Sequence, residues 1–165
     1  MQNKATELFS DWADIGKDEG MAEAHGLAVN QILDQALSGN KSHFNFIDAG
    51  CGNGWVVRKV REMPLCLSSC GIDGAKGMIE NAKRIDPGGD YHLADLLSWS
   101  PNVKAELIFS MEVFYYFKSP EELTRHIVDN WLAPSGRLII GIDHYTGNPD
   151  SCLLYTSPSP RDWLQ

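Results

Sequence analysis

The residues best suited to ligand chemistry lie between Asp48 and Gly54, where three glycines alternate with other residues directly after an apolar run. The run from Phe44 to Ile47 suits a buried strand, and the valines that follow the glycines begin a helical pattern. Glycine has no Cβ, so the backbone of such a turn can approach a ligand closely. The N-terminus of the following helix then presents partial positive charge to an anionic group. This order of strand, glycine turn and helix predicts a nucleotide-binding unit.

The glycine spacing and the preceding acid indicate which kind of ligand binds. Dinucleotide-binding turns follow G-x-G-x-x-G, whereas here Gly54 comes one residue early and Trp55 takes the expected place. A carboxylate at Asp48 would repel a pyrophosphate, but it suits a cofactor that carries a cation and no phosphate. We therefore expect a cationic cofactor, and an NAD(P)-dependent oxidoreductase is the alternative.

The segment 48–54, Asp-Ala-Gly-Cys-Gly-Asn-Gly, closely resembles motif I of the class I S-adenosylmethionine (SAM) dependent methyltransferases. SAM carries a sulfonium, an ammonium and a carboxylate, which agrees with the charge argument. The resemblance covers about residues 40–145. It implies an α/β fold with a Rossmann-like, doubly wound, mostly parallel sheet of about five strands and helices on both faces. It also implies that the family's final antiparallel strand pair has no counterpart in this sequence.

The same resemblance implies a set of cofactor-binding residues. Asp73 ends the second expected strand, about 20 residues after the turn, where the family uses an acid to accept hydrogen bonds from ribose hydroxyls. Asp95 and Leu96 match the family's adenine contacts, and Met78 matches a position that packs on adenine. The complete implied set is Asp48, Gly50, Cys51, Gly52, Gly54, Asp73, Gly74, Met78, Asp95, Leu96 and Met111.

Candidate catalytic residues follow the fourth and fifth expected strands. Methyl transfer requires an aligned acceptor and exclusion of water, and it requires a base where the acceptor must lose a proton. Glu112 and His144 are the candidate bases, although each could instead be a solvated loop residue. Tyr115 could orient an acceptor or, with Tyr116, form a cation–π wall for an amine or the sulfonium. The alternative for both tyrosines is packing against a neighbouring helix.

The elements that must position these residues alternate as strand and helix. Ser119 is expected to cap a helix that starts at Pro120, with Glu122 completing a capping box. A turn at 133–136 is expected to precede the last strand. The expected strands are 44–48, 68–73, 91–95, 106–111 and 137–143, and the helices between them are 55–62, 74–85 and 120–131.

Two further helices are expected before the glycine turn, at about 6–12 and 21–38. In the family that the chain resembles, such helices cover the cofactor and help to form the acceptor pocket. Trp12, Met21 and His25 are the candidates for that role, with core packing as the alternative for each.

Composition narrows the class of partner. The chain has 165 residues, which suggests one domain, and a formal net charge of -8. Nucleic-acid and anionic membrane partners call for a basic face, so we expect neither. The motif Asn/Asp-Pro-Pro-Tyr of the methyltransferases that act on exocyclic amines of nucleic acids does not follow the fourth expected strand, which agrees with the charge argument. The N-terminal residues lack the apolar core of a secretory signal, and no apolar run reaches the length of a membrane span.

The four cysteines, at 51, 66, 70 and 152, form no Cys-x-x-Cys pair, and the histidines are not clustered. This usage is typical of reduced thiols in a cytoplasmic protein, and it predicts no metal site.

The last residues complete the expected organisation. Residues 152–162 read CLLYTSPSPRD, which resembles translated sequencing-adapter DNA; a genuine Pro/Ser-rich tail is the alternative. We therefore expect an N-terminal helical cap (1–40), a truncated SAM-binding core (41–151) and a non-native tail (152–165). The predicted function is SAM-dependent methyl transfer to a small-molecule acceptor. The alternatives are an NAD(P)-dependent oxidoreductase and a SAM-binding regulatory module without transfer activity.

Overall fold

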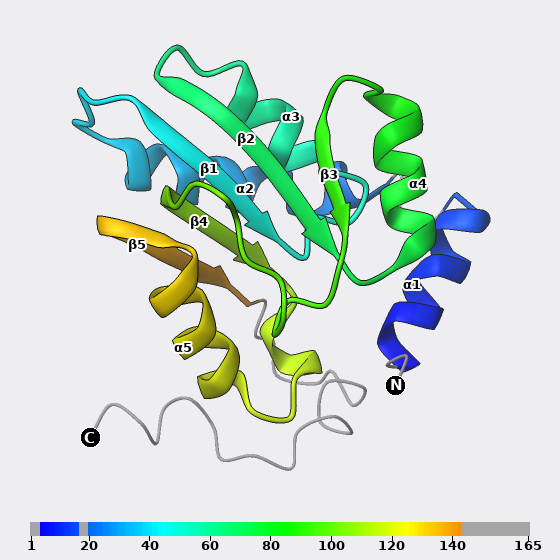
Figure 1. Ribbon diagram of the computed structural model, residues 1–165. Coiled ribbons are helices and arrows are strands. Elements are labelled where there is room, and N and C mark those ends of the chain that lie inside the picture. The colour runs from blue at the N-terminus through cyan, green and yellow to red at the C-terminus, as the bar shows by residue number, and fades with distance from the viewer. Residues whose placement is uncertain (1–3, 17–19, 143–165) are drawn as a thin grey trace.

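The computed structural model describes residues 4–16 and 20–142, which form a five-stranded parallel sheet with helices on both faces (Figure 1). The strand order is β3-β2-β1-β4-β5, and every neighbouring pair is parallel. This sheet confirms the predicted doubly wound α/β fold, and the residues described contain no antiparallel strand pair. The strands are β1 (Phe44–Ala49), β2 (Cys66–Asp73), β3 (Asp90–Leu93), β4 (Ala105–Met111) and β5 (Leu132–Gly141).

The helices divide between the two faces of the sheet. Behind the sheet in Figure 1 lie α2 and α3, and in front of it lies α5. Helix α4 packs beside β3, and α1 packs on the outer side of α4. The helices are α1 (Lys4–Asp14), α2 (Met21–Leu37), α3 (Trp55–Arg61), α4 (Lys76–Ile85) and α5 (Pro120–Asn130), with a 3₁₀ turn η2 (Phe114–Tyr116) after β4. None of the described helices is both long and apolar enough to cross a membrane.

Each central strand supplies apolar side chains to both faces, because successive residues of a strand point in opposite directions. Phe46 of β1 packs with α2 and α3, whereas the next residue, Ile47, packs with α5. Trp131, at the end of α5, is fully buried on that second face. Burial on both faces explains why β1 and β4 read as nearly continuous apolar runs.

The glycine turn lies where the direction of winding changes. β1 is flanked by β2 on one side and β4 on the other. The Ser110 hydroxyl donates a 2.6 Å hydrogen bond to the Ala49 carbonyl, which ties the carboxyl ends of β1 and β4 together. Ligands of open α/β sheets bind at such a switch point, outside the carboxyl ends of the strands.

Two local predictions were wrong. The segment 133–136 does not turn the chain before β5 but forms a bulge within it: Ala105 pairs with Leu132, Leu107 pairs with Arg137, and Ser135 has a φ of 64°. A bulge accommodates extra residues on one strand without ending the ladder. Helix α5 starts at Pro120 as predicted, but no side-chain hydrogen bond caps it; the N–H of Glu122 donates instead to the Ser119 carbonyl at 3.0 Å.

Candidate functional site

The glycine turn is held against the end of β2 by its own backbone. The N–H groups of Gly50 and Cys51 both donate to the Ile72 carbonyl, at 2.7 and 2.9 Å. Gly50, Gly52 and Gly54 have φ values of 83°, 53° and 76°, a region that side chains with a Cβ rarely adopt. Glycines at these positions therefore let the turn keep this shape without the backbone strain that a Cβ would add.

Asp73, the expected ribose acid, also holds the turn. Its carboxylate accepts the N–H of Gly52 at 2.9 Å and the N–H of Ala75 at 2.8 Å. Burial raises the pKa of Asp73, and the N–H groups of Ala75 and Gly52 oppose that shift. The structure thus brings the predicted acid to the predicted turn, with both carboxylate oxygens already engaged by backbone.

Two of the glycines allow close packing within the protein. A Cβ on Gly50 would collide with the Val113 side chain, and a Cβ on Gly54 would collide with the Tyr91 ring. These contacts join the turn to the ends of β4 and β3. Glycine is consequently required at both positions even when no ligand is bound.

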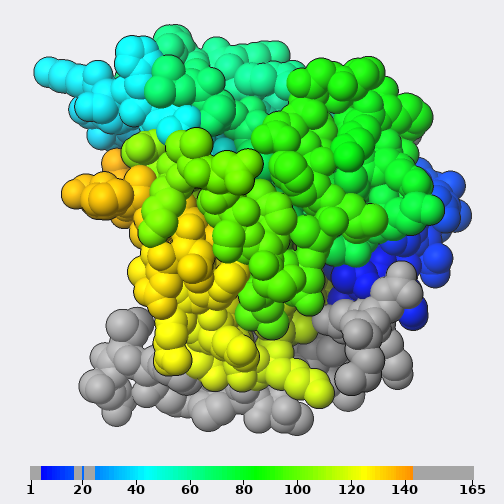
Figure 2. Space-filling model, in the orientation of Figure 1, coloured from blue at the N-terminus to red at the C-terminus, as the bar shows by residue number. Residues whose placement is uncertain are grey.

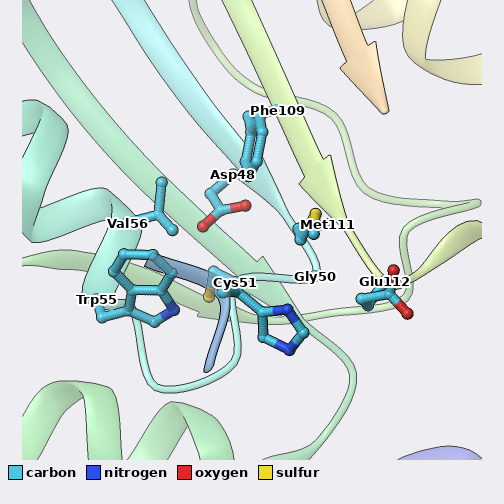
Figure 3. A pocket seen from close by; sticks show the side chains of 9 residues that line it. Asp48, Gly50, Cys51, Trp55, Val56, Phe109, Met111 and Glu112 are labelled. Carbon is cyan, nitrogen blue, oxygen red and sulfur yellow. The ribbon is translucent and has the colours of Figure 1, made fainter. Parts of the chain in front are cut away.

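A small pocket of about 40 Å³ opens beside the turn. Figure 3 shows the Asp48 side chain between Val56 of α3 and Met111 of β4, with Glu112 beyond the end of β4. The pocket lies on the face that α2 and α3 cover, since Phe109 packs with those helices. Its lining residues are His25, Asp48, Gly50, Cys51, Trp55, Val56, Phe109, Met111 and Glu112.

Asp48 is the most strongly perturbed acid of this pocket. Its side chain is buried, with 3% of the residue exposed. Burial, and secondarily the charge of Asp73, raise the pKa of Asp48 to about 8. Among the described residues, those that line the pocket include neither lysine nor arginine. A cation that entered the pocket would therefore stabilise the ionised form of Asp48.

Glu112 adopts a strained backbone at the end of β4. Its φ is 59°, uncommon for a residue with a side chain, and its N–H donates to the Gly141 carbonyl at 2.9 Å. The Tyr115 hydroxyl donates a 2.8 Å hydrogen bond to Glu112 Oε2. Burial and the neighbouring Tyr116 and Glu112 raise the pKa of Tyr115, so its hydroxyl remains a donor. Strain of this kind often occurs at functional sites.

The tyrosines also connect this end of β4 to the N-terminal helix. The rings of Tyr115 and Tyr116 lie 4.4 Å apart, and Phe9 of α1 meets Tyr116 edge-on at 5.4 Å. Trp12, one of the expected cap residues, packs against Phe9 at 5.3 Å. Helix α1 thus contacts both α4 and η2.

The expected adenine contacts do not line this pocket. Met78 is buried against Ala13 of α1, and Leu96 lies in the core on the α5 face. Asp95 follows β3, which ends at Leu93, and its Oδ1 accepts the N–H of Leu97 at 2.9 Å. Their contacts with adenine, and that of Gly74, stay predictions.

Two candidates lie outside the described residues: His144, and the side chain of Met21. The predicted tail, 152–165, lies outside them as well. By contrast, His25 of α2 does line the pocket.

Trp55, Val56 and Phe109 line the pocket but were not among the predicted site residues. One signal could have found Phe109. It lies two residues before Met111 on the same strand, so both side chains point to one face. Trp55 and Val56 open the helix that follows the glycine turn, which places them next to any ligand of that turn.

Comparison with known proteins agrees with this geometry. A family model described as "Methyltransferase domain" matches residues 19–162. The trans-aconitate 2-methyltransferase of Rhizobium leguminosarum bv. trifolii is 27% identical over 117 residues, which is 71% of this chain and 45% of that protein. Its counterpart in Sinorhizobium fredii is 29% identical over 114 residues, covering 69% of this chain and 44% of that protein. The chain therefore spans less than half the length of these curated relatives.

Solved structures share the fold. One is the complex between the Haloferax volcanii Trm112 methyltransferase activator and a methyltransferase, with a TM-score of 0.70 and 25% identity over 87% of this chain and 63% of that chain. Another is the N-methyltransferase NodS from Bradyrhizobium japonicum in complex with S-adenosyl-L-homocysteine (SAH), with a TM-score of 0.55 and 27% identity over 67% of this chain and 58% of that chain. Because the family model matches most of its length, this chain belongs to the methyltransferase domain family.

Proposed function

We propose that this chain contains the SAM-binding half of a methyltransferase that acts on a small-molecule acceptor. The observation that carries the proposal is the buried Asp48, which lines a pocket at the switch point directly before a left-handed glycine turn. The names of the relatives support it: they are trans-aconitate methyltransferases, and NodS was solved with SAH.

The residues at the turn fit the charges of SAM. Asp48 is buried in a pocket to which the described part of the chain contributes no lysine or arginine, so a cationic ligand would offset the cost of ionising it. Asp73 stands beside the turn, where a carboxylate that has two oxygens can accept ribose hydroxyls as well as backbone N–H groups. SAM, when bound, supplies a methyl group that its sulfonium already activates.

Helix α1 covers the region beside Asp73 where the adenosine half of a bound cofactor would lie. A pocket of about 40 Å³ is far smaller than the roughly 300–1,000 Å³ of ordinary ligand sites. Helix α1 closes over the start of α4, where the Ser10 hydroxyl accepts the N–H of Gly77 at 3.3 Å. Its Thr6 methyl group lies 2.9 Å from the position of a Cβ on Gly74, beside Asp73. We infer that α1 is displaced when the adenosine half of the cofactor binds.

On the acceptor side, Glu112 is the best-placed base. It lines the pocket, and the Tyr115 hydroxyl holds its carboxylate at 2.8 Å. Glu112 would accept the proton that the acceptor loses, and the Tyr115 hydroxyl would position the Glu112 carboxylate. Because Glu112 places a carboxylate at the acceptor side of the pocket, whose described lining includes no lysine or arginine, we expect a neutral or cationic acceptor to bind better than a tricarboxylate such as trans-aconitate.

The experiment that tests the proposal has two stages. Calorimetric titration of the 165-residue chain with SAM, SAH and NAD should give binding of the first two only. Transfer of radiolabelled methyl groups should then be measured to a panel of amines and alcohols, with trans-aconitate and a nucleic acid included. Binding of NAD without SAM would revive the oxidoreductase alternative. SAM binding without transfer to any acceptor would favour the regulatory module.

A further inference from the structure

A second cluster of side chains, whose atoms are potential metal ligands, lies on the other face of the sheet. Cys70 of β2 pairs in register with Asp90 of β3, and His92 is two residues further along β3, so all three point to one face. Their ligand atoms all lie within 4.8 Å of one another. His92 Nε2 is 2.8 Å from Asp90 Oδ1.

The surroundings show that the cluster is separate from the Asp48 pocket. Cys70 packs against the core on the α5 face, whereas the pocket lies on the face covered by α2 and α3. The His92 ring lies 5.5 Å from that of Trp99, in the segment after β3. In the space-filling view, green residues of this part of the chain are exposed beside the yellow α5 (Figure 2). The side chains of His92 and Asp90 are 43% and 63% exposed, so an ion could enter from solvent.

The donor set matches one class of metal ion. Thiolate, imidazole and carboxylate together are ligands of Zn²⁺, which binds three protein ligands and one water in open tetrahedral sites. Donor atoms in such a site stand roughly 3–4 Å apart, so a small adjustment of side chains would suffice. Calcium and magnesium prefer oxygen ligands alone.

We propose that Cys70, Asp90 and His92 bind Zn²⁺ or a similar late-transition divalent ion, with water in the remaining position. On binding, the Cys70 sulfur bonds to the ion and its proton leaves to solvent. The ion clamps β3, an edge strand of only 4 residues, to the long strand β2. Local spacing could not show this site, because the register of two strands brings Cys70 to Asp90 from a distant part of the sequence.

The test is a titration of the chelator-treated 165-residue chain with Co²⁺, followed by Zn²⁺. We expect one equivalent of Co²⁺ to produce thiolate charge-transfer absorption and the strong visible bands of a tetrahedral site, and Zn²⁺ to abolish both. Loss of an outer-shell partner alone weakens metal binding about 10–100-fold, so Cys70→Ser and His92→Gln should weaken it at least as much. Zn²⁺ should also raise the melting temperature of the parent chain.

Cys66→Ser is the matched control, because Cys66 begins the same strand, is partly exposed and lies outside the cluster. It should bind Co²⁺ like the parent. A thiolate signal that survives Cys70→Ser would come from another cysteine and would overturn the assignment, as would an octahedral Co²⁺ spectrum without thiolate absorption. Should Cys70→Ser fail to fold by circular dichroism, Asp90→Asn, which changes an exposed side chain, tests the site through its carboxylate: weaker Co²⁺ binding supports the assignment, and Co²⁺ binding as tight as in the parent overturns it.

Discussion

The backbone N–H of Gly52 donates a 2.9 Å hydrogen bond to the carboxylate of Asp73. The glycine turn and the acid at the end of the next strand, which the sequence shows as separate features, are therefore one hydrogen-bonded unit. A ligand that donates a hydrogen bond to the Asp73 carboxylate would therefore share this acceptor with the backbone of the glycine turn.

The first prediction concerns Asp73. Asp73→Ala removes the acceptor of the Gly52 N–H and the proposed ribose contact, so SAM binding should weaken by about 1–3 kcal/mol, the cost of hydrogen bonds to a charged group. Asp73→Asn keeps one acceptor oxygen and should lose less. Calorimetry on both variants measures the difference. Unchanged SAM affinity in the alanine variant would remove Asp73 from the site.

The second prediction separates the cost of a left-handed backbone from a role in binding. Gly52→Val puts a β-branched side chain at a φ of 53°, and Gly39→Val does so at a φ of 71°, in open space after α2. Each should cost stability, at about 1–2 kcal/mol for the backbone alone. Only Gly52→Val should also abolish SAM binding. Equal retention of binding in both would mean that Gly52 serves the fold alone.

The third prediction is a pH dependence from Asp48. Its pKa rises from 3.8 to about 8 on folding, so the folded chain holds a proton that the unfolded chain releases. Stability should therefore fall as pH rises from about 4 to about 8, by up to about 1.4 kcal/mol per pH unit, and then level off. Denaturant unfolding across this range measures the slope.

Asp48→Asn should flatten that slope and stabilise the chain at pH 8. Asp11→Asn, which changes an exposed carboxylate on α1, is the control and should leave the slope as it was. Stability that is constant between pH 5 and pH 8 in the parent would contradict the buried, protonated state of Asp48.

The fourth prediction couples Asp48 to the charge of the ligand. A bound cation favours the ionised carboxylate, so SAM binding below pH 8 should release a proton. Calorimetry in buffers of different ionisation enthalpy measures the number released. SAH lacks the sulfonium charge and should release fewer protons than SAM. Identical release by the two ligands would place the sulfonium away from Asp48.

The sequence predicted the strands, their alternation with helices and the glycine turn, because these follow from apolar periodicity and from glycine chemistry within short windows. It did not predict contacts that depend on strand register. The Tyr91 ring against Gly54 and the approach of Cys70 to Asp90 both arise from the pairing of β2 with β3. The bulge in β5 was missed for a related reason. Pro and Gly in 133–136 are turn signals in the sequence, and only the pairing of the flanking residues with β4 shows that they form a bulge within the strand.

The last prediction concerns the outer edge of the sheet. Among the described residues, β5 pairs with β4 on one side and with no strand on the other. Ile140 and Ile142 are 38% and 40% exposed there, and unpaired backbone groups beside apolar side chains invite edge-to-edge pairing. We expect the 165-residue chain to self-associate, with a concentration-dependent mass by light scattering. Ile140→Lys should reduce the association, since a charged edge resists pairing, whereas Val103→Lys, which adds the same charge in the loop before β4, should leave it unchanged. A monomeric parent at all concentrations, with a sharp cooperative melt, would show that this edge is protected.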